Sequence, residues 1–154
     1  EKILRHFWKK FREEVLTLVD KEIVREKLIH LEEYINDLDE YRDLKLEELT
    51  SDKILFRYLE RTLHLAVEAI LDIGYHIISD ERLGNPVSNK ETIKILAENN
   101  IIKKNLDNYI KMAQFRNIIV HDYADIDPEI MLKIINENIS DLKTIFKWYK
   151  EYIS

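Results

Sequence analysis

The sequence predicts an all-α protein, a single up-and-down bundle of five or six helices. Apolar residues recur at helical spacing of three and four along most of the chain, and no segment alternates as a strand does. Only two glycines and two prolines occur among 154 residues, so tight turns are scarce. Hydrophobic residues make up 45% of the chain, which is enough for one folded domain with its own core.

The composition limits the class of function. Net charge is −6, from 24 Lys plus Arg against 30 Asp plus Glu, which argues against a strongly basic nucleic-acid binder but is compatible with a local basic patch. Without cysteine there is no disulfide, thiolate nucleophile or cysteine-based zinc site. No apolar run approaches the roughly 20 residues of a membrane span, and no signal-peptide pattern is present. We therefore expect a cytoplasmic protein that does not use a membrane.

The first predicted helix covers residues 3–18. Its apolar stripe consists of Ile3, Leu4, Phe7, Trp8, Phe11, Val15 and Leu18. The opposite side is basic, a pattern also found in helices that lie on a membrane surface or face RNA. We favour an amphipathic helix that packs on the bundle. Residues 1–154 are then one domain, in which residues 1–19 form an extra N-terminal helix.

Two longer helices follow, over residues 21–43 and 52–79. Asp20 is expected to cap the first, because its carboxylate can accept an unpaired backbone N–H. Thr50 or Ser51 is expected to cap the second. The second helix is apolar on more than one side, which predicts a central position in the bundle.

The middle of the chain contains residues that indicate where helices pack closely, end and begin. Gly74 inside the central helix indicates either close approach of a neighbouring helix or a tolerated weak point. Residues 80–88 form the one evident loop. Ser88 with Glu91 three residues later is a capping-box pattern for a short helix over residues 89–98.

The last two predicted helices cover residues 103–121 and about 128–152. Between them, Asp127 followed by Pro128 is a strong signal for a new helix, with aspartate as cap and proline in the first turn.

The strongest indication of function is the pattern Arg116-x4-His121-x-Tyr123, at the end of the helix predicted over residues 103–121. The planar guanidinium of arginine can bind two phosphate oxygens through paired N–H donors. Histidine can accept or donate a proton near neutral pH. The same residues also have ordinary structural uses. The guanidinium of an arginine on a helix usually extends into solvent, and a histidine near a helix end usually forms a hydrogen bond. A tyrosine usually buries its ring in the core and leaves its hydroxyl exposed to water.

Helical geometry constrains this motif. Each residue turns a helix by about 100°, so Arg116 and Tyr123 fall on one face, whereas His121 lies about 140° from Arg116. Either the helix ends or bends near His121, or a second copy of the chain completes the site, or the residues do not cooperate. Residues 122–128 are poor helix formers, which favours the first two explanations.

With this motif at the end of a helix, the chain resembles the HEPN superfamily, and most closely its HepT branch of toxins from HEPN/MNT toxin–antitoxin pairs. The resemblance covers roughly residues 20–145. It is carried by the segments 19–21, 31–34, 58–61, 66–72, 74–78, 112–117 and 121–123.

The resemblance implies a metal-independent, cofactor-free endoribonuclease of a type II toxin–antitoxin pair that acts as a homodimer on RNA. Arg116 and His121 would be catalytic, and Asn117 would support them. The partner nucleotidyltransferase antitoxin of MNT type, a separate protein, would add AMP to Tyr123. Lys103, Lys104, Lys111 and the basic side of residues 5–12 would have to frame the RNA.

Two other interpretations are open at this point. The resemblance also allows a non-catalytic protein, which would bind nucleotide or position substrate for a partner nucleotidyltransferase. A purely structural bundle with an accidental motif is the third. On the central helix, Glu68, Asp72 and His76 form a polar ridge, interpreted either as an Asp–His pair four residues apart or as support for the site.

Overall fold

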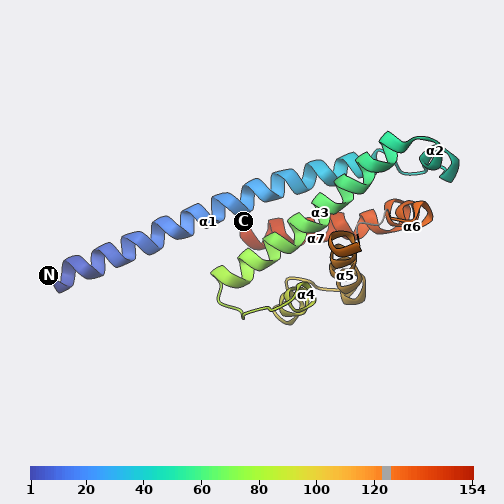
Figure 1. The fold of residues 1–154 in the computed structure, drawn as a ribbon. Helices are drawn as coiled ribbons and strands as arrows, with labels where there is room; N and C mark the ends of the chain where they lie inside the picture. The colour runs from blue at the N-terminus through green and yellow to red at the C-terminus, as the bar shows by residue number, and fades with distance from the viewer. Residues whose placement is uncertain (123–125) are drawn as a thin grey trace.

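The computed structural model of the chain describes residues 1–122 and 126–154, and for residues 16–20 and 118–122 it describes only the backbone. The helices, in order, are α1 (Lys2–Asp39), α2 (Leu46–Ser51), α3 (Lys53–Asp80), α4 (Asn89–Glu98), α5 (Leu106–Asp122), α6 (Pro128–Lys133), the π-helix η1 (Ile134–Asn138) and α7 (Ile139–Ile153). Helices α1 and α3 run side by side in opposite directions, joined at one end through α2 (Figure 1).

The predicted all-helical fold is confirmed, and the described residues contain no strand. The boundaries differ from the predicted ones in several places: α1 ends at Asp39 rather than at residue 43, and α2 was not predicted. Residues 2–39 form one continuous helix, so Asp20 lies inside α1 and no helix begins there. An aspartate inside a helix costs less than about 1 kcal/mol, which is less than the cost of ending a helix that has no glycine or proline to stop it. The last helix is divided by η1 into α6 and α7.

The cap of α3 also differs from the prediction. Asp52, not Thr50 or Ser51, accepts the backbone N–H of Leu55 at 3.0 Å. The hydroxyls of Thr50 and Ser51 instead donate to backbone carbonyls inside α2.

The caps of α4 and α6 are confirmed. The Ser88 hydroxyl accepts the N–H of Glu91 at 3.1 Å, and the Glu91 carboxylate accepts the N–H of Val87 at 2.6 Å. Asp127 accepts the N–H of Glu129 at 2.9 Å, with Pro128 in the first turn of α6.

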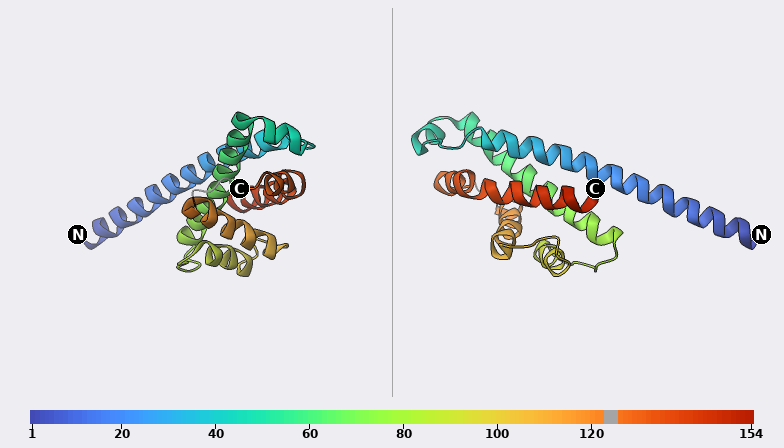
Figure 2. Two further views of the ribbon diagram at one scale, coloured as in Figure 1. Left: turned by 45° about the vertical axis from the view of Figure 1, so that its right-hand side comes forward. Right: turned by 180° about the vertical axis from the view of Figure 1, so that it is seen from behind.

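The N-terminal part of α1 does not pack on the bundle. Phe7 and Trp8 are 59% and 60% exposed, and this segment projects beyond the other helices (Figures 1 and 2). The bundle is contacted by a different face of α1, which includes Leu31. Phe11 and Leu31 are twenty residues apart and therefore point about 160° away from each other. The expectation of packing was wrong because α1 extends past the end of α3, so none of the other described helices lies beside its first residues (Figures 1 and 2).

Helix α3 is central, as predicted, and contacts α1, α2, α4, α5 and α7. Gly74 confirms close approach: a Cβ there would lie 2.7 Å from Leu96 Cδ1 and 2.8 Å from the Tyr149 hydroxyl oxygen. Tyr149 is fully buried and donates to the carbonyl of Ile70 at 2.9 Å. Burial raises the pKa of Tyr149, so its hydroxyl keeps the proton that this bond needs.

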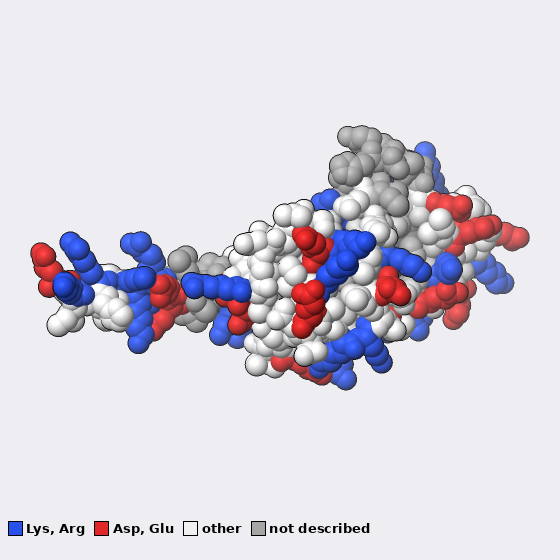
Figure 3. All heavy atoms as spheres, turned by 90° about the horizontal axis from the view of Figure 1, so that it is seen from below, with Lys and Arg blue, Asp and Glu red and all other residues white. Residues whose placement is uncertain are grey.

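The surface carries both signs of charge. On the face shown in Figure 3, Lys and Arg side chains are interspersed with Asp and Glu. No helix in the described part of the chain combines the length and apolar character needed to cross a membrane.

We predict that Gly74→Ala lowers the free energy of unfolding by about 1–3 kcal/mol, because the new methyl group meets Leu96 and Tyr149 in a packed core. Urea unfolding followed by circular dichroism measures the change. Ser79→Ala, at an exposed position on the same helix, should stay within about 0.5 kcal/mol of the wild type. Equal stability of Gly74→Ala and wild type would contradict this packing.

Candidate active site

Arg116 is held at the surface by α3. Its Nη2 lies 3.6 Å from Glu68 Oε1, and the two side chains are 28% and 39% exposed. The two groups form an ion pair, but their distance is too long for a hydrogen bond. An ion pair between partly exposed side chains is a weak interaction. The guanidinium is thus oriented, while most of its donors can still bind another anion.

Glu68 lies between two cations or potential cations. Its other oxygen, Oε2, is 3.7 Å from Nε2 of His64, one turn earlier on α3. This Nε2 is buried and has no hydrogen-bond partner among the described residues. The sequence interpretation missed His64, although its position four residues before Glu68 was the available signal.

The predicted polar ridge on α3 serves two purposes. Glu68 faces the motif helix, whereas Asp72 forms an ion pair with Lys27 of α1 at 3.6 Å. The predicted Asp–His pairing with His76 is therefore replaced by a contact that joins α3 to α1.

Asn117 contacts α4. The side-chain nitrogen of Asn89 donates to Asn117 Oδ1 at 3.1 Å. Asn89 is the first residue of α4, so the bond joins the start of that helix to the position directly after Arg116.

A second carboxylate of α3 holds the chain beyond the motif. Glu60 Oε2 accepts the backbone N–H of Ile126 at 3.1 Å. Glu60 and Glu68 are eight residues apart, or about 12 Å along α3. They bind residues on the two sides of the segment 117–125.

The remaining motif residues are only partly placed. Helix α5 continues through position 121 and ends at Asp122, within the range where the sequence predicted its end. A continuous helix separates the directions of residues 116 and 121 by about 140°. The side chain of His121 and all of Tyr123 lie outside the described residues.

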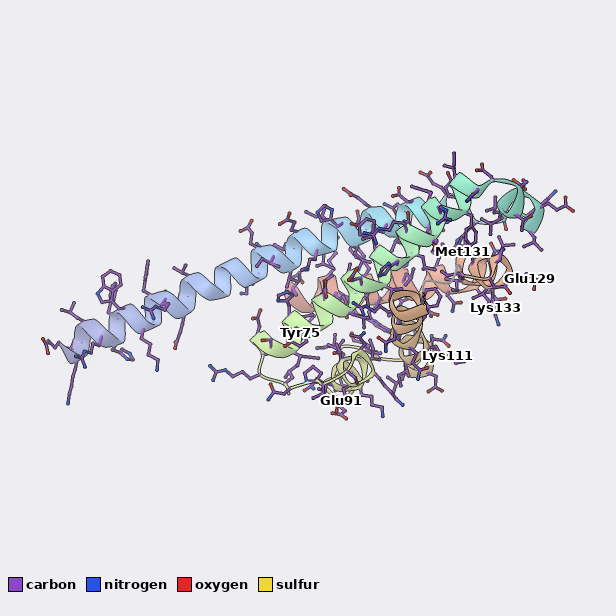
Figure 4. The ribbon with its side chains drawn as sticks, viewed as in Figure 1. Tyr75, Glu91, Lys111, Glu129, Met131 and Lys133 are labelled. Carbon is purple, nitrogen blue, oxygen red and sulfur yellow. The ribbon has the colours of Figure 1, made fainter. Side chains whose placement is uncertain are left out.

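The basic groups expected around the motif are dispersed. Lys103 is 3.9 Å from Glu151 of α7. The basic residues at 5–12 are on the projecting part of α1, away from the bundle (Figure 2). Lys111 remains exposed on α5 itself, five residues before Arg116 (Figure 4).

The sequence matches the model of the ribonuclease HepT-like family over residues 31–147. The matched segment contains Arg116, Asn117, His121 and Tyr123 and excludes the projecting part of α1.

Two curated proteins are similar in sequence. The mRNA nuclease HepT of Shewanella oneidensis is 38% identical over 77 residues, which span 49% of this chain and 58% of that protein. The tRNA nuclease HepT of Aphanizomenon flos-aquae is 28% identical over 122 residues, or 79% of this chain and 83% of that protein.

Among solved structures, the tri-AMPylated HEPN toxin of Shewanella oneidensis in complex with MNT antitoxin has a similar fold. The TM-score is 0.74 at 28% identity, and the superposition covers 84% of this chain and 97% of the toxin.

We predict that Glu60→Ala raises the hydrogen-exchange rate of the Ile126 amide about tenfold, because the charged acceptor of that amide is lost. Exchange followed by NMR measures this residue directly. Glu48→Ala, on the exposed surface of α2, is the matched control and should leave the Ile126 rate unchanged. An equally slow Ile126 amide in Glu60→Ala would show that the carboxylate does not hold this end of the segment.

Proposed function

We propose that this chain, which belongs to the HepT-like ribonuclease family, is a metal-independent endoribonuclease and the toxin of a type II toxin–antitoxin pair. The observation that carries the proposal is the family match over residues 31–147, with the Arg-x4-His-x-Tyr motif at the end of a helix that α3 and α4 hold in place. We also propose that the protein acts in the cytoplasm, where cellular RNA is available.

Arg116 is proposed to bind the phosphate that is cut. The fork of N–H donors fits two phosphate oxygens, and its charge stabilises the negative charge that builds up as the bond breaks. The weak pair with Glu68 keeps the guanidinium in position before RNA binds, and a phosphate in its fork forms shorter, charge-assisted bonds than the 3.6 Å contact.

His121 is proposed to move the proton. As a base, it takes the proton from the ribose 2′-hydroxyl, whose oxygen then attacks phosphorus. The bond to the 5′-oxygen breaks, that oxygen takes up a proton, and a 2′,3′-cyclic phosphate remains. Asn117, held by Asn89, is proposed to orient the substrate beside Arg116.

The active form is proposed to be a homodimer. One continuous helix directs residues 116 and 121 about 140° apart, so one copy does not easily bring both side chains to one phosphate. Two copies of α5 that face each other would let Arg116 of one chain act with His121 of the other.

Inhibition is proposed to act through Tyr123. The similar toxin from Shewanella oneidensis is AMPylated and bound to an MNT antitoxin. On this chain, a nucleotidyltransferase of that type would transfer AMP to the Tyr123 hydroxyl and release pyrophosphate from ATP. Added phosphates close to Arg116 would repel RNA and occupy the same guanidinium.

A second candidate is a non-catalytic partner of a nucleotidyltransferase. The net charge of −6 favours it, because an acidic protein attracts RNA poorly. It would form a stable complex with the nucleotidyltransferase and would cut no RNA.

We predict that Arg116→Ala and His121→Ala each lower kcat/KM for RNA cleavage about 100-fold or more, whereas the fold is retained. Cleavage of a labelled RNA in the presence of EDTA is the assay, and circular dichroism checks the fold. Lys133→Ala, an exposed cation on α6, should cleave at the wild-type rate. Unchanged cleavage in both motif variants would overturn the proposed chemistry.

We predict that co-expression with the cognate nucleotidyltransferase adds one or more AMP groups to the wild type and none to Tyr123→Phe. Intact-mass spectrometry detects the addition, and the modified wild type should no longer cut RNA. Tyr58→Phe, an exposed tyrosine on α3, serves as the control that is still modified. AMP found on Tyr123→Phe would assign the modification to another residue.

A further inference from the structure

A shallow pocket of about 510 Å³ lies directly beside Asn117. It forms where the C-terminal part of α3, the loop before α4, the start of α4, and α5 come together. Its walls include Tyr75, Val87, Ser88, Asn89 and Asn117. Figure 4 shows Tyr75 near the end of α3 that lies closest to α4. The proposed chemistry uses only Asn117 from this set.

Tyr75 is placed differently from the tyrosines that build the core. Tyr109 and Tyr149 are 1% and 0% exposed and donate hydrogen bonds to backbone carbonyls. Tyr75 is 54% exposed and lines the pocket. An exposed aromatic ring in a pocket is the surface on which proteins stack unpaired RNA bases.

Asn89 and Asn117 supply polar groups at the same place. The bond from Asn89 Nδ2 to Asn117 Oδ1 fixes both amides relative to each other. Asn89 Oδ1 and Asn117 Nδ2 have no hydrogen-bond partner in the part of the chain that the structure describes. The two amides thus keep one acceptor and one donor for a ligand, and the edge of a nucleobase also presents a donor and an acceptor.

The pocket adjoins the proposed phosphate site. Asn117 follows Arg116 in the sequence, and Tyr75 follows Glu68, the partner of Arg116, by seven residues on α3. Seven residues bring Tyr75 to within about 20° of the face of Glu68, about 10 Å further along the helix. One strand of RNA can therefore contact Arg116 and the pocket together.

We propose that this pocket binds one unpaired base of the RNA, next to the phosphate that Arg116 holds. The base stacks on Tyr75, and its edge is read by Asn89 and Asn117. This inference rests on the proposed ribonuclease function and adds to it a determinant of where the RNA is cut.

The test measures RNA affinity in the His121→Ala background, so that the RNA stays intact. Fluorescence anisotropy is recorded with four oligoribonucleotides of equal length, made of A, C, G or U alone. Tyr75→Ala should weaken binding of the preferred oligoribonucleotide about tenfold, the usual effect of losing one stacked base. Tyr75→Phe, which keeps the ring, should stay within about twofold of its parent.

Two further variants make the result specific. Asn89→Ala should reduce the differences in affinity among the four oligoribonucleotides, because it removes the acceptor that reads the base edge. Tyr58→Ala is the matched control, with a tyrosine on the same helix that is 43% exposed but lies at the α2 end. It should bind all four as its parent does.

Equal RNA binding by Tyr75→Ala and its parent would overturn the base pocket. So would a Tyr75→Ala chain that binds RNA normally but loses its complex with the nucleotidyltransferase, which would make the pocket a protein-docking site.

The ribonuclease function is judged separately, with native His121. If that chain cuts no RNA while Tyr75→Ala still lowers RNA affinity, the pocket stands and the ribonuclease proposal fails. If it cuts RNA and Tyr75→Ala leaves affinity and cleavage positions unchanged, the pocket fails and the ribonuclease proposal stands.

Discussion

The close packing of α3 against its neighbours positions the part of the proposed site that the structure describes, namely Arg116 and Asn117. Because Gly74 has no side chain, Leu96 of α4 and the Tyr149 hydroxyl of α7 approach the α3 backbone directly. This contact sets the position of α4, whose first residue, Asn89, then reaches Asn117. The same α3 helix supplies Glu68 to Arg116 and Glu60 to Ile126, so one helix contacts the chain before and after the segment 117–125.

The second constraint is the helical period of α5. A helix that continues to Asp122 presents residues 116 and 121 in directions about 140° apart. The proposed chemistry requires a guanidinium that binds the phosphate and an imidazole that transfers a proton, both close to one phosphorus atom. These requirements are reconciled if two chains share each site. Phosphate binding depends on Arg116 itself, since the net charge of −6 gives the chain no long-range attraction for RNA.

Local patterns predicted what depends on neighbours in the sequence. The central position of α3, the Ser88 cap and the Asp127–Pro128 start are all present in the structure. The predicted break at Asp20 is wrong because a residue that can cap a helix does not by itself end one, and no glycine or proline stops the helix there. The pairs at the site join residues far apart in the sequence, such as Asn89 with Asn117 and Glu60 with Ile126. A single sequence carries no signal for such contacts, whereas the motif itself is local and was predicted from spacing and resemblance.

The most direct test of the central claim, a site shared between two chains, is to mix Arg116→Ala with His121→Ala. If each site takes its arginine from one chain and its histidine from the other, a mixed dimer keeps one intact site of two. With half of the dimers mixed, RNA cleavage should return to about one quarter of the wild-type rate. If two inactive variants remain inactive after exchange of subunits, while the wild type cuts RNA as a dimer, each chain carries its own complete site and the account is contradicted.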